Sequence, residues 1–303
     1  GPGNTGQDAV HGVTANFSNA SSSGSVVNLD SNAYTGFWAL AVIGTGFVGN
    51  SGFTISSANG RSITLGQLNS GGLNGEGGVW IQNNFTGSNI TENVAVPLLL
   101  TGNSASYLFA NWSNPALNDT LEISGNIVPT VNSTILATGS GNGIFSGNIL
   151  AGPATMSMTF DTAATWTMSG SNTYTGVTTV DNGTLVLDYT TNNTSKVAVH
   201  NTVDLGGGGA AELQLLGNNG AATSQSITGL VSESQGGGVV LLSPGAGQSI
   251  TFNVGNLTRG VGSAIDFEGV SGTGTINTLT VNGAGGILGA GYTVNQTGWA
   301  TSG

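Results

Sequence analysis

Apolar and polar residues alternate along many short stretches of this chain. In each stretch every second residue is apolar, and those between are mostly serine, threonine or asparagine. A period of two places the apolar side chains on one face of a strand and the polar ones on the other. The clearest stretches are 62–66, 120–124, 164–168, 184–187, 249–254 and 275–281. The pattern predicts half-buried strands and an all-β fold.

Glycine and asparagine separate these stretches and predict turns at a spacing of roughly 8–12 residues, which also fits a sandwich or a closed barrel. A solenoid is favoured because 303 residues of uniform texture are long for one sandwich. Similar blocks of alternation followed by glycine also recur, as if each formed one side of a turn. We therefore predict a parallel β-solenoid with turns of about 20–25 residues.

The whole chain, 1–303, is predicted to be one solenoid. Its first part, 1–150, is irregular and richer in aromatic residues, and the pattern becomes more regular over 151–303. Pro97 interrupts the apolar run 94–100. Since proline cannot donate to a strand ladder, that run is predicted to be an edge or bulged strand.

Three blocks of the second half carry a resemblance to a known repeat, at 169–187, 257–267 and 286–300. The first contains Gly-Ser-Asn-Thr-Tyr-Thr-Gly, then Thr-Thr-Val, a turn and Gly-Thr-Leu. In these blocks the chain resembles the autotransporter-associated β-strand repeat, or passenger-associated transport repeat. The likeness is strongest to the large extracellular repeat proteins of planctomycetes and verrucomicrobia. The resemblance implies a right-handed parallel β-helix that is secreted or displayed on the cell surface.

Charged residues make up only 6% of the chain, and the formal net charge is −11. The three basic residues, Arg61, Lys196 and Arg259, are scattered. Nucleic acids and anionic membranes attract clustered Lys and Arg, so neither partner is expected. The most apolar run, 37–43, is too short to span a bilayer and is soon interrupted by glycine, so no membrane insertion is expected.

Asp266 and Glu268 are the strongest candidates for catalysis, because a glycosidase needs two carboxyl groups. They stand two residues apart and should share one face of a strand. A polysaccharide lyase would also need a basic group, and Arg259 is near in sequence. We interpret the two acids as part of a solvated outer face, so no catalytic residue and no enzyme activity are predicted.

Metal and cofactor sites have little support in the sequence. Without cysteine the chain has neither disulfides nor thiolate ligands. His11 and His200 stand alone, without the partner spacing of a zinc site. No cofactor is predicted and the metal ligands stay unknown. Calcium remains an alternative, because two loops are rich in oxygen ligands: Asn118 with Asp119, and Asp181 with Asn182.

Two sets of residues bear on sugars. Twelve Asn-x-Ser/Thr sequences occur, which a chain rich in these residues produces by chance; examples are Asn16, Asn84, Asn111, Asn193 and Asn256. Tryptophans stack on sugars when they are exposed. Core positions are expected for all five of them: Trp38, Trp80, Trp112, Trp166 and Trp299.

These observations favour a structural or adhesive β-solenoid of the bacterial cell exterior. Open strand edges at the ends of a solenoid predict pairing with further copies and a self-assembling filament. Two alternatives stay open: a carbohydrate-active β-helix enzyme and a non-catalytic adhesin that binds surface glycans.

Overall fold

The computed structural model of this chain describes residues 14–16, 26–28, 39–44, 52, 54–65, 77–83, 89–101, 106–206, 210–234, 236–269, 273–281, 292–295 and 298–299. The chain divides into two compact units, Gly1–Met156 and Ser157–Gly303, each considered by itself below. That 1–303 forms one solenoid stays a prediction. The described residues form strands, turns and one short 3-10 helix, η1 (Pro115–Leu117), which confirms the all-β class. Among them no helix has the length and hydropathy to cross a membrane.

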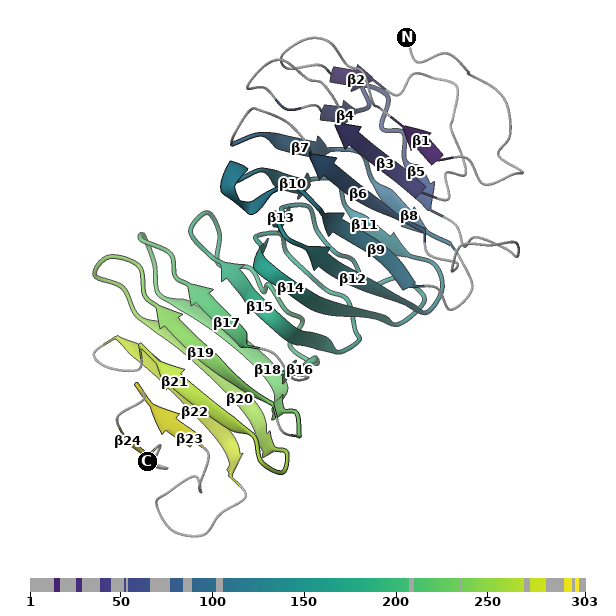
Figure 1. The fold of residues 1–303 in the computed structure, drawn as a ribbon. Coiled ribbons are helices and arrows are strands. Elements are labelled where there is room, and N and C mark those ends of the chain that lie inside the picture. The colour runs from purple at the N-terminus through teal and green to yellow at the C-terminus, as the bar shows by residue number, and fades with distance from the viewer. Residues whose placement is uncertain are drawn as a thin grey trace. The chain divides into compact units, whose positions relative to one another are not determined.

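The strands of the first unit pair in parallel in three stacks, which we call its faces (Figure 1). Each strand pairs with a strand from the preceding turn rather than with its neighbour in sequence, which is the arrangement of a parallel β-solenoid. The first face stacks β1 (Thr14–Asn16), β3 (Ala39–Gly44), β6 (Gly77–Asn83), β9 (Ser106–Asn111) and β12 (Ser133–Gly139); the second stacks β2 (Val26–Asn28), β4 (Thr54–Ser56), β7 (Thr91–Val94), β10 (Thr120–Ile123) and β13 (Asn142–Phe145); the third stacks β5 (Ile63–Leu65), β8 (Leu98–Leu100) and β11 (Ile127–Pro129).

The core of this unit consists of inward side chains stacked in register. On the second face one buried column contains Ile55, Val94, Ile123 and Phe145, each opposite the next. The ring of Phe145 meets that of Phe109, from the first face, edge to face at 5.6 Å between centroids. Burying such columns contributes about 25 cal/mol per Å² of apolar surface, so a chain with few charges can still be stable.

The apolar run 94–100 crosses a corner of the solenoid. β7 ends at Val94 on the second face, and β8 begins at Leu98 on the third. Pro97 lies between them, and its carbonyl accepts a hydrogen bond from the amide of Ile63 at 2.9 Å. The predicted edge or bulged strand is therefore wrong. The fixed φ of proline and its missing N–H suit the turn between two faces.

The second unit is also a parallel solenoid, with longer strands that cross from one face to the next. One face stacks the end of β15 (Thr178–Asp188) with β17 (Ala211–Leu216), β19 (Gly237–Ser243), β21 (Ala264–Glu268) and β23 (Tyr292–Val294). The start of β15, β16 (Thr202–Leu205), β18 (Thr223–Ser232), β20 (Ile250–Arg259) and β22 (Gly274–Val281) form the others. β14 (Met156–Met168) pairs in parallel with β15, and β24 (Gly298–Trp299) pairs antiparallel with β23.

Turns in this unit are longer than predicted. Thr202 lies opposite Gly229, and Ala211 lies opposite Gly238, so each of these turns takes 27 residues. The additional residues form corner loops such as 189–201. The parallel solenoid is thus confirmed, while the predicted turn of about 20–25 residues is too short because alternation marks the strands and not the corners.

Candidate functional site

The carboxylates with the strongest catalytic pattern lie on the outer side of β21. Asp266 and Glu268 alternate with the buried Ile265 and Phe267, so they share one face of the strand, as their spacing predicted. The hydroxyl of Thr293 donates to Oδ1 of Asp266 at 2.6 Å, which joins one turn to the next. Asp266 therefore takes part in the hydrogen bonding of the stack itself.

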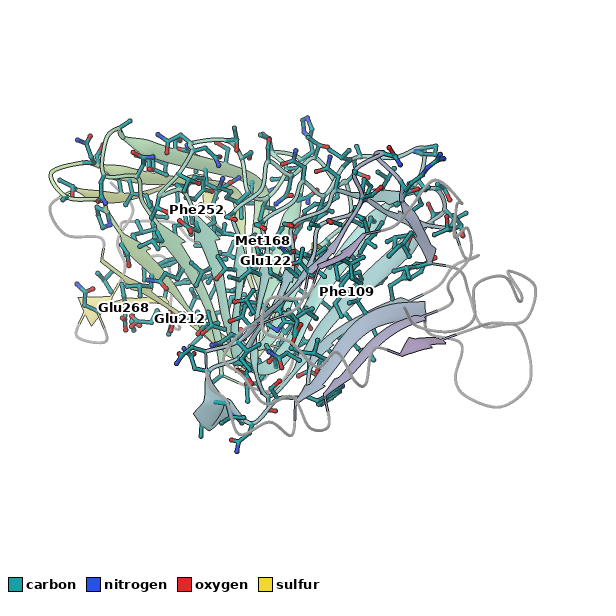
Figure 2. The ribbon with its side chains drawn as sticks, turned by 90° about the horizontal axis from the view of Figure 1, so that it is seen from above. Phe109, Glu122, Met168, Glu212, Phe252 and Glu268 are labelled. Carbon is teal, nitrogen blue, oxygen red and sulfur yellow. The ribbon has the colours of Figure 1, made fainter. Side chains whose placement is uncertain are left out.

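A third carboxylate, Glu212 on β17, belongs to the same outer surface, and Figure 2 shows it on the same side of the ribbon as Glu268. Partial burial raises the pKa of Glu212, and the charge of Glu268 raises it further. In the register of the strands, Val239 stands between Glu212 and Asp266. The acids are thus spread along a strand surface with an aliphatic residue between them, whereas a glycosidase holds its two carboxyl groups across a substrate.

Arg259 holds a corner of the second unit. Its Nη1 donates to the carbonyl of Ser263 at 2.8 Å, and the Ser263 hydroxyl donates to the carbonyl of Gly260 at 2.8 Å. Burial raises the pKa of Tyr292, and the charge of Arg259 offsets part of that rise. These contacts give Arg259 a structural role at the end of β20.

Neither histidine contributes to a described site. His200 is exposed in the loop before β16, and His11 lies outside the described residues. In the part of the chain that the structure describes, no group of three or more His, Asp and Glu side chains is arranged to hold a metal ion.

The two loops predicted as calcium ligands use their oxygens within the chain. Asp119 is buried, and its Oδ1 accepts the amide of Ile90 at 2.9 Å. Oδ1 of Asn182 accepts the amide of Gly183 at 3.0 Å, next to the half-buried Asp181. These bonds stabilise a corner and a turn, and whether either loop also binds calcium stays a prediction.

A loop of the first unit, residues 112–118, leaves β9 and returns to β10. Asn111 closes its base: its Nδ2 donates to the carbonyl of Asp119 at 2.9 Å and to that of Asn142 at 2.7 Å. Its Oδ1 accepts the amide of Ser113 at 2.9 Å. Because the Asn111 side chain is fully buried and hydrogen-bonded, its Asn-x-Ser sequence is not an accessible glycosylation site in the folded chain.

The tryptophans do not share one environment. Trp166, on β14, is fully buried, whereas Trp112 is 47% exposed. The expected core position is confirmed for Trp166 and wrong for Trp112, which follows the last residue of β9, where the chain turns away from the sheet. Trp38 and the side chains of Trp80 and Trp299 lie outside the described residues.

Two other asparagines of the predicted glycosylation sequences, Asn193 and Asn256, are exposed. The Asn193 amide donates to the carbonyl of Ala222 at 3.0 Å and accepts the Thr223 hydroxyl at 3.1 Å, which links successive turns. The side chain of Asn16 and all of Asn84 lie outside the described residues.

The sequence analysis missed Lys196, which is fully buried in the second unit. Its Nζ donates to the carbonyl of Ser169 at 2.8 Å and to Oδ1 of Asn192 at 2.6 Å. The amine also lies 5.3 Å from the ring centroid of Tyr189, a cation–π contact. Burial lowers the pKa of Lys196 to about 8, and the charge of Asp188 offsets part of that shift.

A polar network surrounds this lysine. The Tyr189 hydroxyl donates to Oε1 of Gln225 at 2.5 Å, and the Lys196 amide donates to the same oxygen at 3.0 Å. Nε2 of Gln225 donates to the carbonyl of Val197 at 2.7 Å. Because Gln225 belongs to the following turn, the network joins two turns of the core, and we assign it a structural role.

The buried amine makes a pH-dependent stability expected. Between pH 8 and 10.5, the ordinary pKa of lysine, the unfolded chain binds more protons than the folded one. The free energy of unfolding should therefore rise with pH through this window, by on the order of 1 kcal/mol after allowance for residual hydration. Burial also raises the pKa values of Tyr174 and Tyr189, so ionisation of these tyrosines in the unfolded chain opposes the rise above about pH 10.

Urea unfolding followed by circular dichroism from pH 7.5 to 9.5 measures this dependence. In a Lys196→Met variant the rise should disappear while the rest of the pH profile is kept. An equal rise in both proteins would assign it to another group.

The hallmark residues of the recurring block point into the core. Every even-numbered residue from 166 to 180 is buried. Nδ2 of Asn172 donates to the carbonyl of Lys196 at 2.9 Å, and the Tyr174 hydroxyl lies 2.6 Å from that of Thr178. The motif therefore determines how one turn is built and stacked.

One complete turn separates the two ends of this block. Thr165 on β14 lies opposite Thr184 on β15, and Met168 lies opposite Leu187. Residues 163–187 match the family model of the passenger-associated transport repeat, so the matched segment and the structural turn coincide. No curated protein and no solved structure matches the chain.

Proposed function

We propose that this chain is a structural and adhesive solenoid of the passenger type, secreted or displayed on the cell surface. One observation carries the proposal: the matched repeat, 163–187, forms one turn with Asn172 and Tyr174 inside it. A repeat whose characteristic residues fill the interior specifies stacking and leaves the outer surface available for contacts. The description of the repeat as associated with transported passengers supports the external location.

Absence of catalysis is part of this proposal. The candidate acid Asp266 bonds to Thr293 in the next turn, and Arg259 bonds to Ser263 in its own corner. Val239 stands between Asp266 and Glu212. These are the contacts of a scaffold, which favours a structural role over a carbohydrate-active enzyme.

Adhesion is favoured over end-to-end filament growth. Addition of another copy would need the open edge of the last turn. The antiparallel strand β24 pairs with Thr293 and Val294 of β23 along that edge. An antiparallel strand at this position competes with a parallel strand from a second copy.

Single cysteines test the external location, because the natural chain has none. Thr175 is exposed and Val180 is fully buried in the same turn. On intact cells that produce the full chain, a membrane-impermeant maleimide should label Thr175→Cys. The Val180→Cys control should react only after denaturation. Labelling of Thr175→Cys in lysed but not in intact cells would contradict the proposal.

A further inference from the structure

The loop 112–118 is an ordered projection of the first unit. Oδ1 of Asn114 accepts the amide of Ala116 at 3.0 Å, and the amide of Leu117 donates to the Asn114 carbonyl at 2.9 Å. The hydroxyl of Ser140, from the next turn, donates to the Ser113 carbonyl at 2.8 Å. An aromatic side chain held on such a loop loses little conformational freedom when it binds a ligand.

Trp112 and Asn118 flank the base of this loop. The hydrogen bond from Asn111 to the carbonyl of Asp119 brings the two ends of the loop together. Trp112 follows Asn111 and Asn118 precedes Asp119, and both side chains are exposed. Asn118 adopts the left-handed conformation, with φ 53°, that ends η1.

Asn118 is the centre of a ladder of exposed amides. Its Nδ2 donates to Oδ1 of Asn89 at 2.9 Å, and its Oδ1 accepts Nδ2 of Asn142 at 3.1 Å. These three residues come from three successive turns, whose strands are about 4.8 Å apart. A primary amide carries two N–H groups and two lone pairs, so the ladder bonds of Asn118 leave donor and acceptor capacity for a ligand.

This corner presents neutral groups. The nearest carboxylates, Asp119 and Glu92, are buried, with exposures of 1% and 6%. Trp112, Asn89 and Asn118 supply an indole and amides at the surface. A ligand for this corner therefore needs an apolar face and many neutral hydroxyl groups, and an anionic polymer gains no charge pairing from these groups.

We propose that Trp112 and the amide ladder of Asn89, Asn118 and Asn142 bind a neutral oligosaccharide. The indole stacks on the apolar face of one pyranose ring. The amides of successive turns exchange hydrogen bonds with hydroxyl groups of neighbouring sugars. This inference rests on the adhesive role proposed above and names the class of ligand.

Titration of the full chain with cellohexaose, chitohexaose and mannohexaose, followed by tryptophan fluorescence and calorimetry, tests this site. At least one of these neutral sugars should bind. Trp112→Ala should weaken that binding about tenfold or more, and Asn118→Ala should weaken it by a smaller factor. Val261→Ala is the matched control, because Val261 is an 84% exposed apolar residue of the second unit.

Circular dichroism of each variant checks that the fold is kept. Failure of all three sugars to bind at millimolar concentration would overturn the inference, as would equal binding by Trp112→Ala or stronger binding of polygalacturonate. Surface labelling of Thr175→Cys is independent of sugar binding. Labelling without binding would therefore reject this site alone, and binding without labelling would reject the external location.

Discussion

Replacement of Gly183 by alanine should cost about 3–4 kcal/mol of unfolding free energy. Gly183 has φ 76°, a conformation that L-residues rarely adopt. A Cβ atom there would lie 2.3 Å from the carbonyl oxygen of Thr162 and 2.6 Å from that of Ala164. Those carbonyls belong to the irregular part of β14 that faces β15, so the clash is with backbone and cannot be relieved by a change of rotamer.

Gly247→Ala is the control for this prediction. Gly247 has φ 70°, and a Cβ built on it meets no atom within 4 Å. Its replacement therefore measures backbone strain alone, which is about 1 kcal/mol. Chemical denaturation followed by circular dichroism gives both values. Equal losses for the two variants would show that the carbonyls of the facing strand move aside.

Replacement of Tyr174 by alanine should destabilise the protein by about 3–5 kcal/mol. Its ring is fully buried, and its hydroxyl is hydrogen-bonded to Thr178. Removal of the ring leaves a cavity inside the turn that the repeat motif specifies. Tyr174→Phe keeps the packing and loses the hydrogen bond, so about 1 kcal/mol is expected.

Thr175→Ala is the matched control on the same turn. Thr175 is exposed beside Tyr174, and its truncation should change the free energy of unfolding by less than about 0.5 kcal/mol. The same denaturation experiment ranks the three variants. A loss for Tyr174→Ala no larger than that for Thr175→Ala would contradict the inward, structural role of the motif.

The candidate sites differ in how far local pattern predicts them. That Asp266 and Glu268 share one strand face follows from a spacing of two residues, and the structure agrees. Trp112 follows an alternating strand, and only the departure of the loop from β9 exposes it. The environment of Lys196 depends on Gln225, 29 residues further along the chain, so no local pattern could indicate it.

Alternation and turn composition were enough to predict the all-β class, the parallel solenoid and the repeat at 169–187, because strand periodicity is a property of neighbouring residues. The 27-residue turns, the corner at Pro97 and the closed base of the loop 112–118 depend on which turn stacks on which. Contacts between residues far apart in sequence create those features. For that reason the amide ladder, the exposed indole and the buried amine were decided by the tertiary structure.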